Sequence, residues 1–372
     1  MESPAVYLFG FEHKALLEII SIRQGRKMNR NLICALLLTV IALPGESLAE
    51  SDKKLRYGPE NPDVTYVPHK YKEQLFDTGD AVINYATTGS PGKPAIVLLP
   101  GQTESWWGYE PAMGMLSDHF QVFAVDLRGQ GRSSRTPRRY TYDNFGNDIL
   151  KLITFVIGRP VIVSGLSSGG VLAAWLSAYA PPGMIRGAHY EDPPLFSSEL
   201  APAFGPGMRQ HIVGPLFESL TIYLGDQWSV GDYEGLVQAI PSMGLPAAPS
   251  QNVKEYDPEW ARAFITGTVS TTCDHARMLS RVKCPVLFTH HSSSVDPATG
   301  IVMGASTVQQ VDQVERLVKG AGQPFTRLSF PKMGHSMHGE DPALFVRTIA
   351  EWAKTLPTEA KVRESGVFAR KK

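Results

Sequence analysis

The sequence is poor in cysteine, balanced in charge and free of long apolar runs. Lys and Arg together number 36, as do Asp and Glu, so the chain has no basic field and nucleic acid is not an expected partner. No stretch reaches the roughly 18 apolar residues of a membrane span, so none is expected in the mature chain. Hydrophobic residues make up 43% of the 372 residues, which is typical of a soluble protein with a sizeable core.

The three cysteines say little about the redox compartment. Cys34 lies in an apolar run near the N-terminus, which leaves Cys273 and Cys284 for the folded part of the chain. Outside the cytosol this pair could form one disulfide. Two buried free thiols are favoured over that pairing, because the intervening segment looks helical and disulfide geometry is demanding.

A signal peptide is expected over residues 28–49. A basic start from Met28 precedes the apolar run Leu32 to Leu43, and Ser47-Leu48-Ala49 supplies small residues at the cleavage position. The mature protein is then secreted or periplasmic and begins near Glu50, with residues 1–27 as a leader of unassigned role. An uncleaved anchor is the alternative, disfavoured because the apolar run is short.

The most informative stretch is 161–170, Val-Ile-Val-Ser-Gly-Leu-Ser-Ser-Gly-Gly. An apolar β-branched run ends in Gly165-Leu166-Ser167-Ser168-Gly169, and an Ala- and Leu-rich helical segment follows. This is the strand–turn–helix setting of a G-x-S-x-G nucleophile elbow. Only glycine fits two positions before and after the serine, and the hydroxyl sits at a helix N-terminus. An ordinary turn is the alternative, which the flanking strand and helix disfavour.

Short apolar strands alternate with helical segments over residues 70–194 and 283–356, which we interpret as one core. Strands are expected at 73–76, 82–86, 96–99, 122–125, 161–163, 187–190, 286–289 and 326–330, and helices at 106–116, 144–157, 168–179, 308–319 and 342–354. This pattern predicts an α/β fold with a mostly parallel sheet covered on both faces. Residues 195–282 break the rhythm with weak helical patches and many aromatics, which predicts an inserted helical cap.

Four motifs in this order make the chain similar to the α/β-hydrolase superfamily over nearly all of residues 70–356. They are Leu-Leu-Pro-Gly-Gln at 98–102, Asp-Leu-Arg-Gly-Gln-Gly-Arg-Ser at 126–133, Gly-Leu-Ser-Ser-Gly at 165–169 and Lys-Met-Gly-His-Ser-Met-His at 332–338. The resemblance implies the α/β-hydrolase fold, with Asp126 and Arg128 holding loops by charge-assisted hydrogen bonds. Within the superfamily, the chain resembles capped esterases and lactone hydrolases such as the fungal zearalenone lactonases, which also carry Ser-Ser-Gly at the elbow.

Ser167 needs a neighbouring base, because a serine hydroxyl alone is a poor nucleophile. The resemblance places that base at His335, on the loop after the last strand, and His338 is a nearby but less favoured histidine. His290 and His291 could line the pocket. As adjacent residues they alternate faces, so no shared metal site is expected.

Three carboxylates compete for the role of triad acid. Asp296 occupies the family's most common place, after the strand that follows the cap, but Asp296 to Gly300 also looks like an Asx-type turn. Asp192 follows the strand before the cap, where zearalenone lactonases and some dehalogenase relatives carry the acid, and its alternative role is to cap a turn. Asp192 and Asp296 carry equal weight, and Glu191, of opposite side-chain direction, comes third.

The resemblance assigns the oxyanion hole to the backbone N–H groups of Ser168 and Gln102. Trp106 and Trp107 follow this second loop, and we expect an aromatic wall of the pocket or, for one of them, core packing.

The expected protein is a secreted serine hydrolase that cleaves a small carboxylic ester or lactone through an acyl-enzyme, without cofactor or metal. A serine at the elbow disfavours epoxide hydrolase and haloalkane dehalogenase chemistry, which use a carboxylate nucleophile in this family. One alternative is another reaction of the same triad, carbon–carbon bond hydrolysis or cofactor-free haloperoxidation. The other is a non-hydrolytic ligand-binding protein on the same scaffold. The sequence assigns neither a substrate nor an oligomeric state.

Overall fold

The structure is a computed structural model. It describes residues 67–197, 212–225, 230–241, 244–298, 300–364 and 366–369. The expected signal peptide and the leader before it lie outside these residues. In the described part, no helix is both long and apolar enough to cross a membrane.

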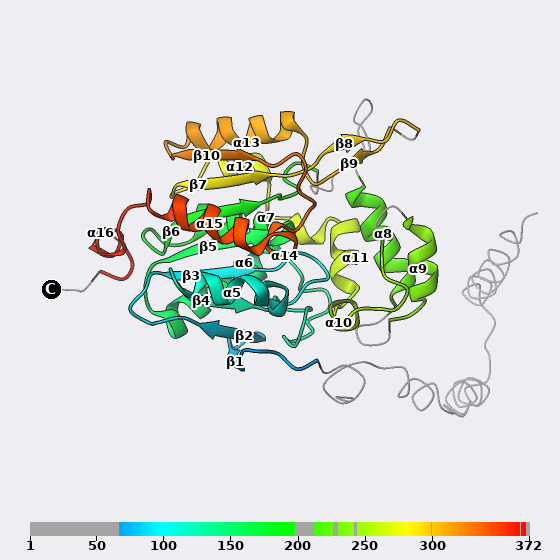
Figure 1. The fold of residues 1–372 in the computed structure, drawn as a ribbon, viewed down its shortest axis with the longest axis horizontal. Helices are drawn as coiled ribbons and strands as arrows, with labels where there is room; N and C mark the ends of the chain where they lie inside the picture. The colour runs from blue at the N-terminus through cyan, green and yellow to red at the C-terminus, as the bar shows by residue number, and fades with distance from the viewer. Residues whose placement is uncertain are drawn as a thin grey trace, which may run out of the picture. The chain divides into compact units, whose positions relative to one another are not determined.

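An eight-stranded sheet forms the centre of the fold, in the order β1-β2-β4-β3-β5-β6-β7-β10 (Figure 1). The bounds are β1 (Glu73–Asp77), β2 (Val82–Thr88), β3 (Ala95–Leu99), β4 (Gln121–Val125), β5 (Val161–Leu166), β6 (Ile185–Glu191), β7 (Val286–His290) and β10 (Phe325–Ser329). β2 is antiparallel to β1 and β4, and the remaining neighbours pair in parallel. The expected mostly parallel sheet is confirmed.

Helices cover both faces of this sheet (Figure 1). One face carries α5 (Glu110–Leu116), α14 (Met337–Glu340) and α15 (Pro342–Ala353), and the other carries α6 (Tyr142–Leu152), α7 (Ser168–Tyr179), α12 (His275–Leu279) and α13 (Val308–Gly320). Because side chains alternate along a strand, Ile96 and Leu98 of β3 join the first core, whereas Val97 and Leu99 join the second.

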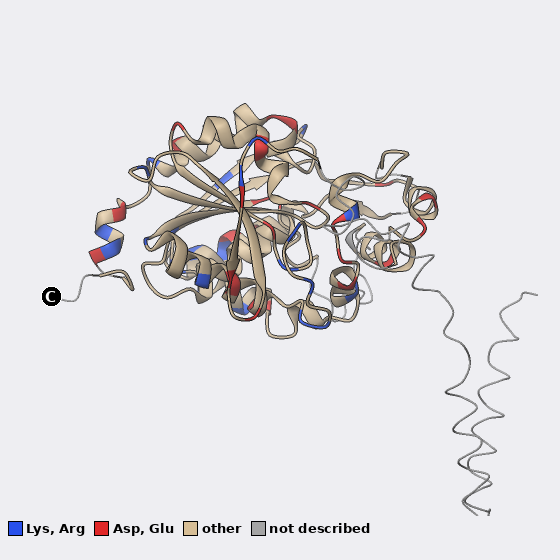
Figure 2. Cartoon of the chain, turned by 90° about the horizontal axis from the view of Figure 1, so that it is seen from below, with Lys and Arg blue, Asp and Glu red and all other residues tan. Residues whose placement is uncertain are grey.

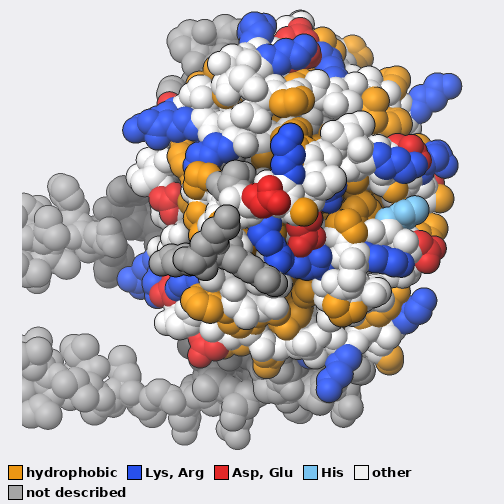
Figure 3. All heavy atoms as spheres, turned by 90° about the vertical axis from the view of Figure 1, so that its left-hand side faces the viewer, with side chains coloured by type: hydrophobic (Ala, Val, Ile, Leu, Met, Phe, Trp, Pro, Cys, Tyr) orange, Lys and Arg blue, Asp and Glu red, His pale blue; other side chains and the backbone are white. Residues whose placement is uncertain are grey.

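Charged residues lie mostly on the helices and loops around the sheet (Figure 2). On the face that carries α16 (Glu359–Glu364), basic, acidic and apolar side chains are interspersed (Figure 3). This distribution agrees with the equal numbers of basic and acidic residues in the sequence.

Some element bounds differ from those expected. The segment 106–116 starts as the 3₁₀-helix η2 (Trp106–Tyr109), and the expected 144–157 helix begins at Tyr142 and ends in the π-helix η3 (Ile153–Ile157). Thr141 sets the start, because its hydroxyl accepts from Asn144 N at 3.1 Å. Gly158 sets the end with a left-handed φ of 67°. The hairpin β8 (Ser294–Val295) and β9 (Val302–Met303) has no counterpart among the strands expected from the sequence.

Between β6 and β7, the described chain is helical. It forms α8 (Val213–Tyr223), α9 (Tyr233–Ala239), α10 (Gln251–Lys254), α11 (Glu259–Ile265), η5 (Thr268–Ser270) and then α12. Phe217 and Phe264 pack with ring centroids 4.2 Å apart, and Trp260 meets Phe145 of α6 at 4.9 Å. Two further aromatics of this segment, Phe204 and Trp228, lie outside the described residues. Cys273 and Cys284 are both buried and form no disulfide with each other, the state that the sequence favours.

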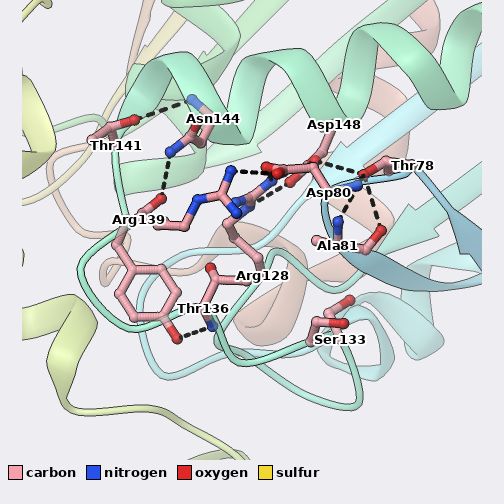
Figure 4. A network of polar contacts seen from close by, with 12 residues as sticks. Thr78, Asp80, Ala81, Arg128, Ser133, Thr136, Arg139, Thr141, Asn144 and Asp148 are labelled. Carbon is pink, nitrogen blue, oxygen red and sulfur yellow. Dashed lines mark hydrogen bonds and ion pairs between the residues drawn. The ribbon is translucent and has the colours of Figure 1, made fainter.

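The loop after β4 is fixed by buried charge. Asp126 accepts hydrogen bonds from Trp106 N at 2.7 Å, from Asn84 Nδ2 at 2.8 Å and from Arg132 N at 3.0 Å. Arg128, 1% exposed, forms two 2.7 Å hydrogen bonds to Asp148 of α6 and one of 3.0 Å to Asp80 (Figure 4). Arg128 thus holds its loop by charge-assisted hydrogen bonds, as expected. Asp126 holds its loop by three hydrogen bonds, and burial raises the pKa of its carboxyl to about 7.

Asp148→Asn should destabilise the fold by about 3 kcal/mol or more, because it leaves a buried guanidinium without its bidentate partner. The matched control is Asp80→Asn. The Asp80 side chain is 29% exposed, so this substitution should lower the free energy of unfolding by about 1 kcal/mol or less. Urea unfolding of both variants measures the difference. Equal small losses would contradict the importance assigned to the buried pair.

Candidate active site

Ser167 lies in a strained turn between β5 and α7. Its φ of 54° and ψ of −120° belong to a region that residues other than glycine rarely adopt. A Cβ at Gly165 would lie 2.0 Å from Gly169 O, and one at Gly169 would lie 2.3 Å from Leu99 O. Only glycine therefore fits at both positions, as the elbow motif requires. The Ser167 N–H donates to Glu191 O at 2.8 Å, which ties the turn to the end of β6.

His335 lies on the loop between β10 and α14 and is paired with Asp192. The distance from His335 Nδ1 to Asp192 Oδ2 is 2.8 Å. The Asp192 side chain is 2% exposed, whereas that of His335 is 48% exposed. A buried carboxylate thus orients a ring whose other nitrogen is left for chemistry. The Ser167 hydroxyl forms no hydrogen bond to His335 among the described residues, and such bonds often tighten only when substrate binds.

Asp192 is held in place from neighbouring strands. Its N–H donates to Thr289 O at 2.9 Å, and its Oδ1 accepts from His291 N at 3.3 Å. His291 Nδ1 in turn lies 3.1 Å from His335 O. His291 therefore contacts both members of the pair and supports their alignment.

His290 and His291 point in different directions, as their adjacent positions imply. His290 Nε2 lies 2.9 Å from Ser306 O, while His291 faces Asp192 and His335. Among the described residues, no group of three or more His, Cys, Asp or Glu side chains is arranged to hold a metal ion.

Asp296, which the sequence favours equally with Asp192 as the triad acid, forms a turn instead. It follows β8, and its Oδ1 accepts from Ala298 N at 2.8 Å, while Gly300 N donates to its carbonyl oxygen at 2.8 Å. These bonds form the Asx-type turn that was the alternative for this residue. The structure therefore brings Asp192, and not Asp296, to the Nδ1 atom of His335.

Glu191 and His338 form a second pair beside the first. His338 Nδ1 lies 3.2 Å from both carboxylate oxygens of Glu191, and Oε1 also accepts from Met337 N at 2.8 Å. Glu191 and His338 are 0% and 1% exposed. The His338 ring stacks on Tyr109, with centroids 3.8 Å apart. The His338 ring is buried and cannot contact a substrate, so the exposed His335 is the better placed base. Sequence reasoning missed this pairing.

The loop after β3 approaches the serine closely. A Cβ built on Gly101 would lie 3.4 Å from Ser167 Cβ. Gln102 directly follows Gly101, and Ser168 directly follows Ser167. The two residues expected to supply the oxyanion N–H groups are therefore the next residues along the chain from this close approach. Buried Gln102 Nε2 and Ser168 Oγ have no hydrogen-bond partner among the described residues. Polar groups that lack partners in a buried site suit a polar ligand. Gln102 Oε1 accepts from Tyr256 OH at 2.9 Å, a cap contact that the sequence did not predict.

The two tryptophans after this loop differ. Trp106 is fully buried in the core, and its Nε1 donates to Glu73 Oε1 at 2.8 Å. Trp107 is half-buried and stacks on His69 at 5.4 Å. Core packing is thus the outcome for Trp106.

The charges around His335 favour its protonated form. Desolvation lowers the pKa of His335. The hydrogen bond to Asp192 and the charges of Asp192 and Glu104 raise it by more, so the net pKa lies above the ordinary 6.5. Such a shift stabilises the imidazolium that forms when the ring takes a proton.

Comparison with known proteins agrees with this fold. The chain is similar to 3-oxoadipate enol-lactonase 2 of Acinetobacter baylyi, with 30% identity over 104 residues, 27% of this chain and 38% of the lactonase. It is 31% identical over 104 residues to epoxide hydrolase 4 of Mus musculus, 27% of this chain and 29% of that protein. The chain thus matches well under half the length of both relatives.

The structure of an esterase from Rhodococcus sp. ECU1013 has the same fold. The match has a TM-score of 0.56 and 20% identity, and it covers 77% of this chain and 99% of the esterase. The sequence model of the "Alpha/beta hydrolase family" matches residues 96–348, a range that includes the elbow, Asp192 and His335. The chain therefore belongs to the alpha/beta hydrolase family.

Proposed function

We propose that this protein is a serine hydrolase that cleaves a small carboxylic ester or lactone through an acyl-enzyme. Ser167 is the nucleophile, His335 the general base and Asp192 the acid that orients it. The observation that carries the proposal is the 2.8 Å contact between His335 Nδ1 and the buried Asp192, in a fold whose elbow presents Ser167. A nucleophile, a base and an orienting acid are the parts that acyl transfer needs.

In the proposed reaction, Ser167 Oγ attacks the substrate carbonyl while His335 Nε2 takes its proton. The negative charge on the carbonyl oxygen is stabilised by the N–H groups of Ser168 and Gln102. The N-terminus of α7 (Ser168–Tyr179) adds the positive end of a helix dipole at the same place. Collapse expels the alcohol, protonated by His335, and water activated by the same ring then releases the acid.

The choice of ester or lactone rests on the nucleophile and on the relatives. The sequence matches an enol-lactonase and an epoxide hydrolase about equally well, so similarity alone does not choose between them. The elbow carries Ser167, whereas epoxide opening in this family uses a carboxylate nucleophile. A serine nucleophile with a histidine base suits acyl transfer, which favours the lactonase and esterase side of the family.

Ser167→Ala should lower hydrolysis of an aryl ester or lactone by ~10³-fold or more, because the nucleophile is removed. The same substitution should abolish labelling by a fluorophosphonate probe. Ser168→Ala is the matched comparison and should cost far less, since it keeps the backbone N–H. Turnover that survives in the Ser167→Ala variant would refute the assignment, and a wild type inert to both reagents would favour a binding protein.

Asp192→Asn should reduce kcat by about 10⁴-fold, the loss seen when a triad carboxylate can no longer hold the histidine tautomer. The neutral form of His335 is the base, so kcat/KM rises as pH rises through its pKa, which Asp192 holds above 6.5. Removing that charge lowers the pKa, so the acidic limb of the pH profile moves to lower pH.

Asp296→Asn is the matched control for this experiment. An asparagine side-chain oxygen still accepts from Ala298 N–H, so kcat and the pH profile should stay close to wild type. Circular dichroism checks folding of both variants. A severe loss in Asp296→Asn with a mild one in Asp192→Asn would reverse the assignment.

We also propose that the protein is exported and cleaved near Ala49, on the evidence of the apolar run and small residues of the sequence. N-terminal sequencing of material recovered outside the cytoplasm should begin close to Glu50. A purified chain that still contained residues 28–45 would show an anchor instead.

A further inference from the structure

The Glu191–His338 pair is a buried charge cluster that the proposed reaction does not use. Glu191 Oε1 accepts from the N–H groups of Met337 and His338 at 2.8 and 3.2 Å. Glu191 therefore binds the backbone two and three residues after His335. Glu191 therefore holds the end of the loop that carries His335, and Asp192, the next residue, orients the His335 ring.

The other side of the His338 ring faces the loop after β3. His338 Nε2 lies 3.8 Å from Glu104 Oε2 and 3.3 Å from Ser336 Oγ. The same Glu104 oxygen accepts from Gly101 N at 3.2 Å, and Glu104 N donates to Gly101 O at 3.4 Å. Glu104 thus closes the turn that contains Gln102, next to Ser167.

Every group around the ring fixes its position or charge. Tyr109 stacks on it and donates to Leu99 O at 2.8 Å, and burial raises the pKa of this phenol well above its ordinary value. His189 is neutral, because burial lowers its pKa to about 4. Glu191, Glu104 and His335 act on the pKa of the ring through their charges.

Electrostatics keep the pair ionised. Burial opposes charge on both groups, but their mutual attraction outweighs it, so the pKa of Glu191 falls to about 2 and that of His338 rises above 6.5. A buried carboxylate that lost this partner would be left with uncompensated charge, which is strongly unfavourable.

We infer that His338 is a positioning residue: it bridges Glu191 and Glu104 and thereby couples the loop that carries His335 to the loop that carries Gln102. The inference rests on the proposed function, because it assigns the bridge a role in placing the base and one oxyanion donor around Ser167. Oxyanion stabilisation depends on donor position in the transition state. Loosening the bridge should therefore lower kcat much more than it changes KM.

Three substitutions test the bridge in the full-length protein. His338→Asn keeps a donor near the Nδ1 position toward Glu191 but does not reach Glu104, and should lower kcat by about 10- to 100-fold. His338→Gln places an amide near the Nε2 position and should recover part of that loss. Glu104→Gln keeps an acceptor for Gly101 N–H but removes the charge, and should lower kcat less than His338→Asn. His119→Asn, on the exposed turn after α5, is the control and should behave as wild type.

Histidine side-chain ¹⁵N NMR gives a readout that a purely structural role would not move. His338 should stay protonated on both nitrogens at pH values where an ordinary histidine is neutral, and Glu104→Gln should lower its pKa. A neutral His338 at pH 6, or His338→Asn and Glu104→Gln variants with kcat within twofold of wild type, would overturn the inference. If His338→Asn fails to fold, Glu104→Gln and the NMR titration decide.

Labelling of the wild type by a fluorophosphonate separates this outcome from failure of the proposed function. A wild type that is not labelled overturns the serine hydrolase proposal and, with it, the role of the bridge. A wild type that is labelled, beside variants with unchanged kinetics, overturns only the role of His338.

Discussion

The end of β6 is the constraint on which the site depends. Glu191 is its last residue and Asp192 follows, and each carboxylate holds one histidine of the same loop. In a regular strand, adjacent side chains point to opposite faces. Asp192 leaves the extended conformation with a φ of 39°, and this break lets one carboxylate contact the loop between β10 and α14 and the other contact the start of α14. The strain of that conformation is offset by the hydrogen bonds that the two side chains make.

The fold and the elbow turn at Ser167 could be predicted because their signals are local. Buried strands appear as apolar runs, and the elbow needs glycine at two positions where a Cβ would overlap the backbone. Thr141 and Gly158, which set the ends of α6 and η3, are also local signals. The short hairpin β8–β9 carried no comparable periodicity, since each strand has two residues.

The sequence could not show which of Asp192 and Asp296 lies against His335, for a physical reason. Asp192 and Asp296 each precede a proline and each suit a turn. The neighbouring residues therefore do not distinguish one aspartate from the other. The choice depends on a contact between residues 143 positions apart, which follows from the order of β6, β7 and β10 in the sheet. The same holds for Glu191 and His338: each ranks low as a triad member by itself, and only the fold shows that they pair with one another.

The segment between α10 and α11 links the helices that follow β6 to the loop after β3. Asp257 N donates to Gly129 O at 2.8 Å, and the Asp257 carboxylate contacts Tyr140 OH and lies 3.6 Å from Arg135 Nε. This docking places Tyr256 so that its hydroxyl reaches Gln102 Oε1. Movement of the cap would therefore be transmitted to the residue whose N–H is the proposed oxyanion donor. Under the proposed function, Tyr256 then acts on kcat through the position of Gln102, by way of this one hydrogen bond.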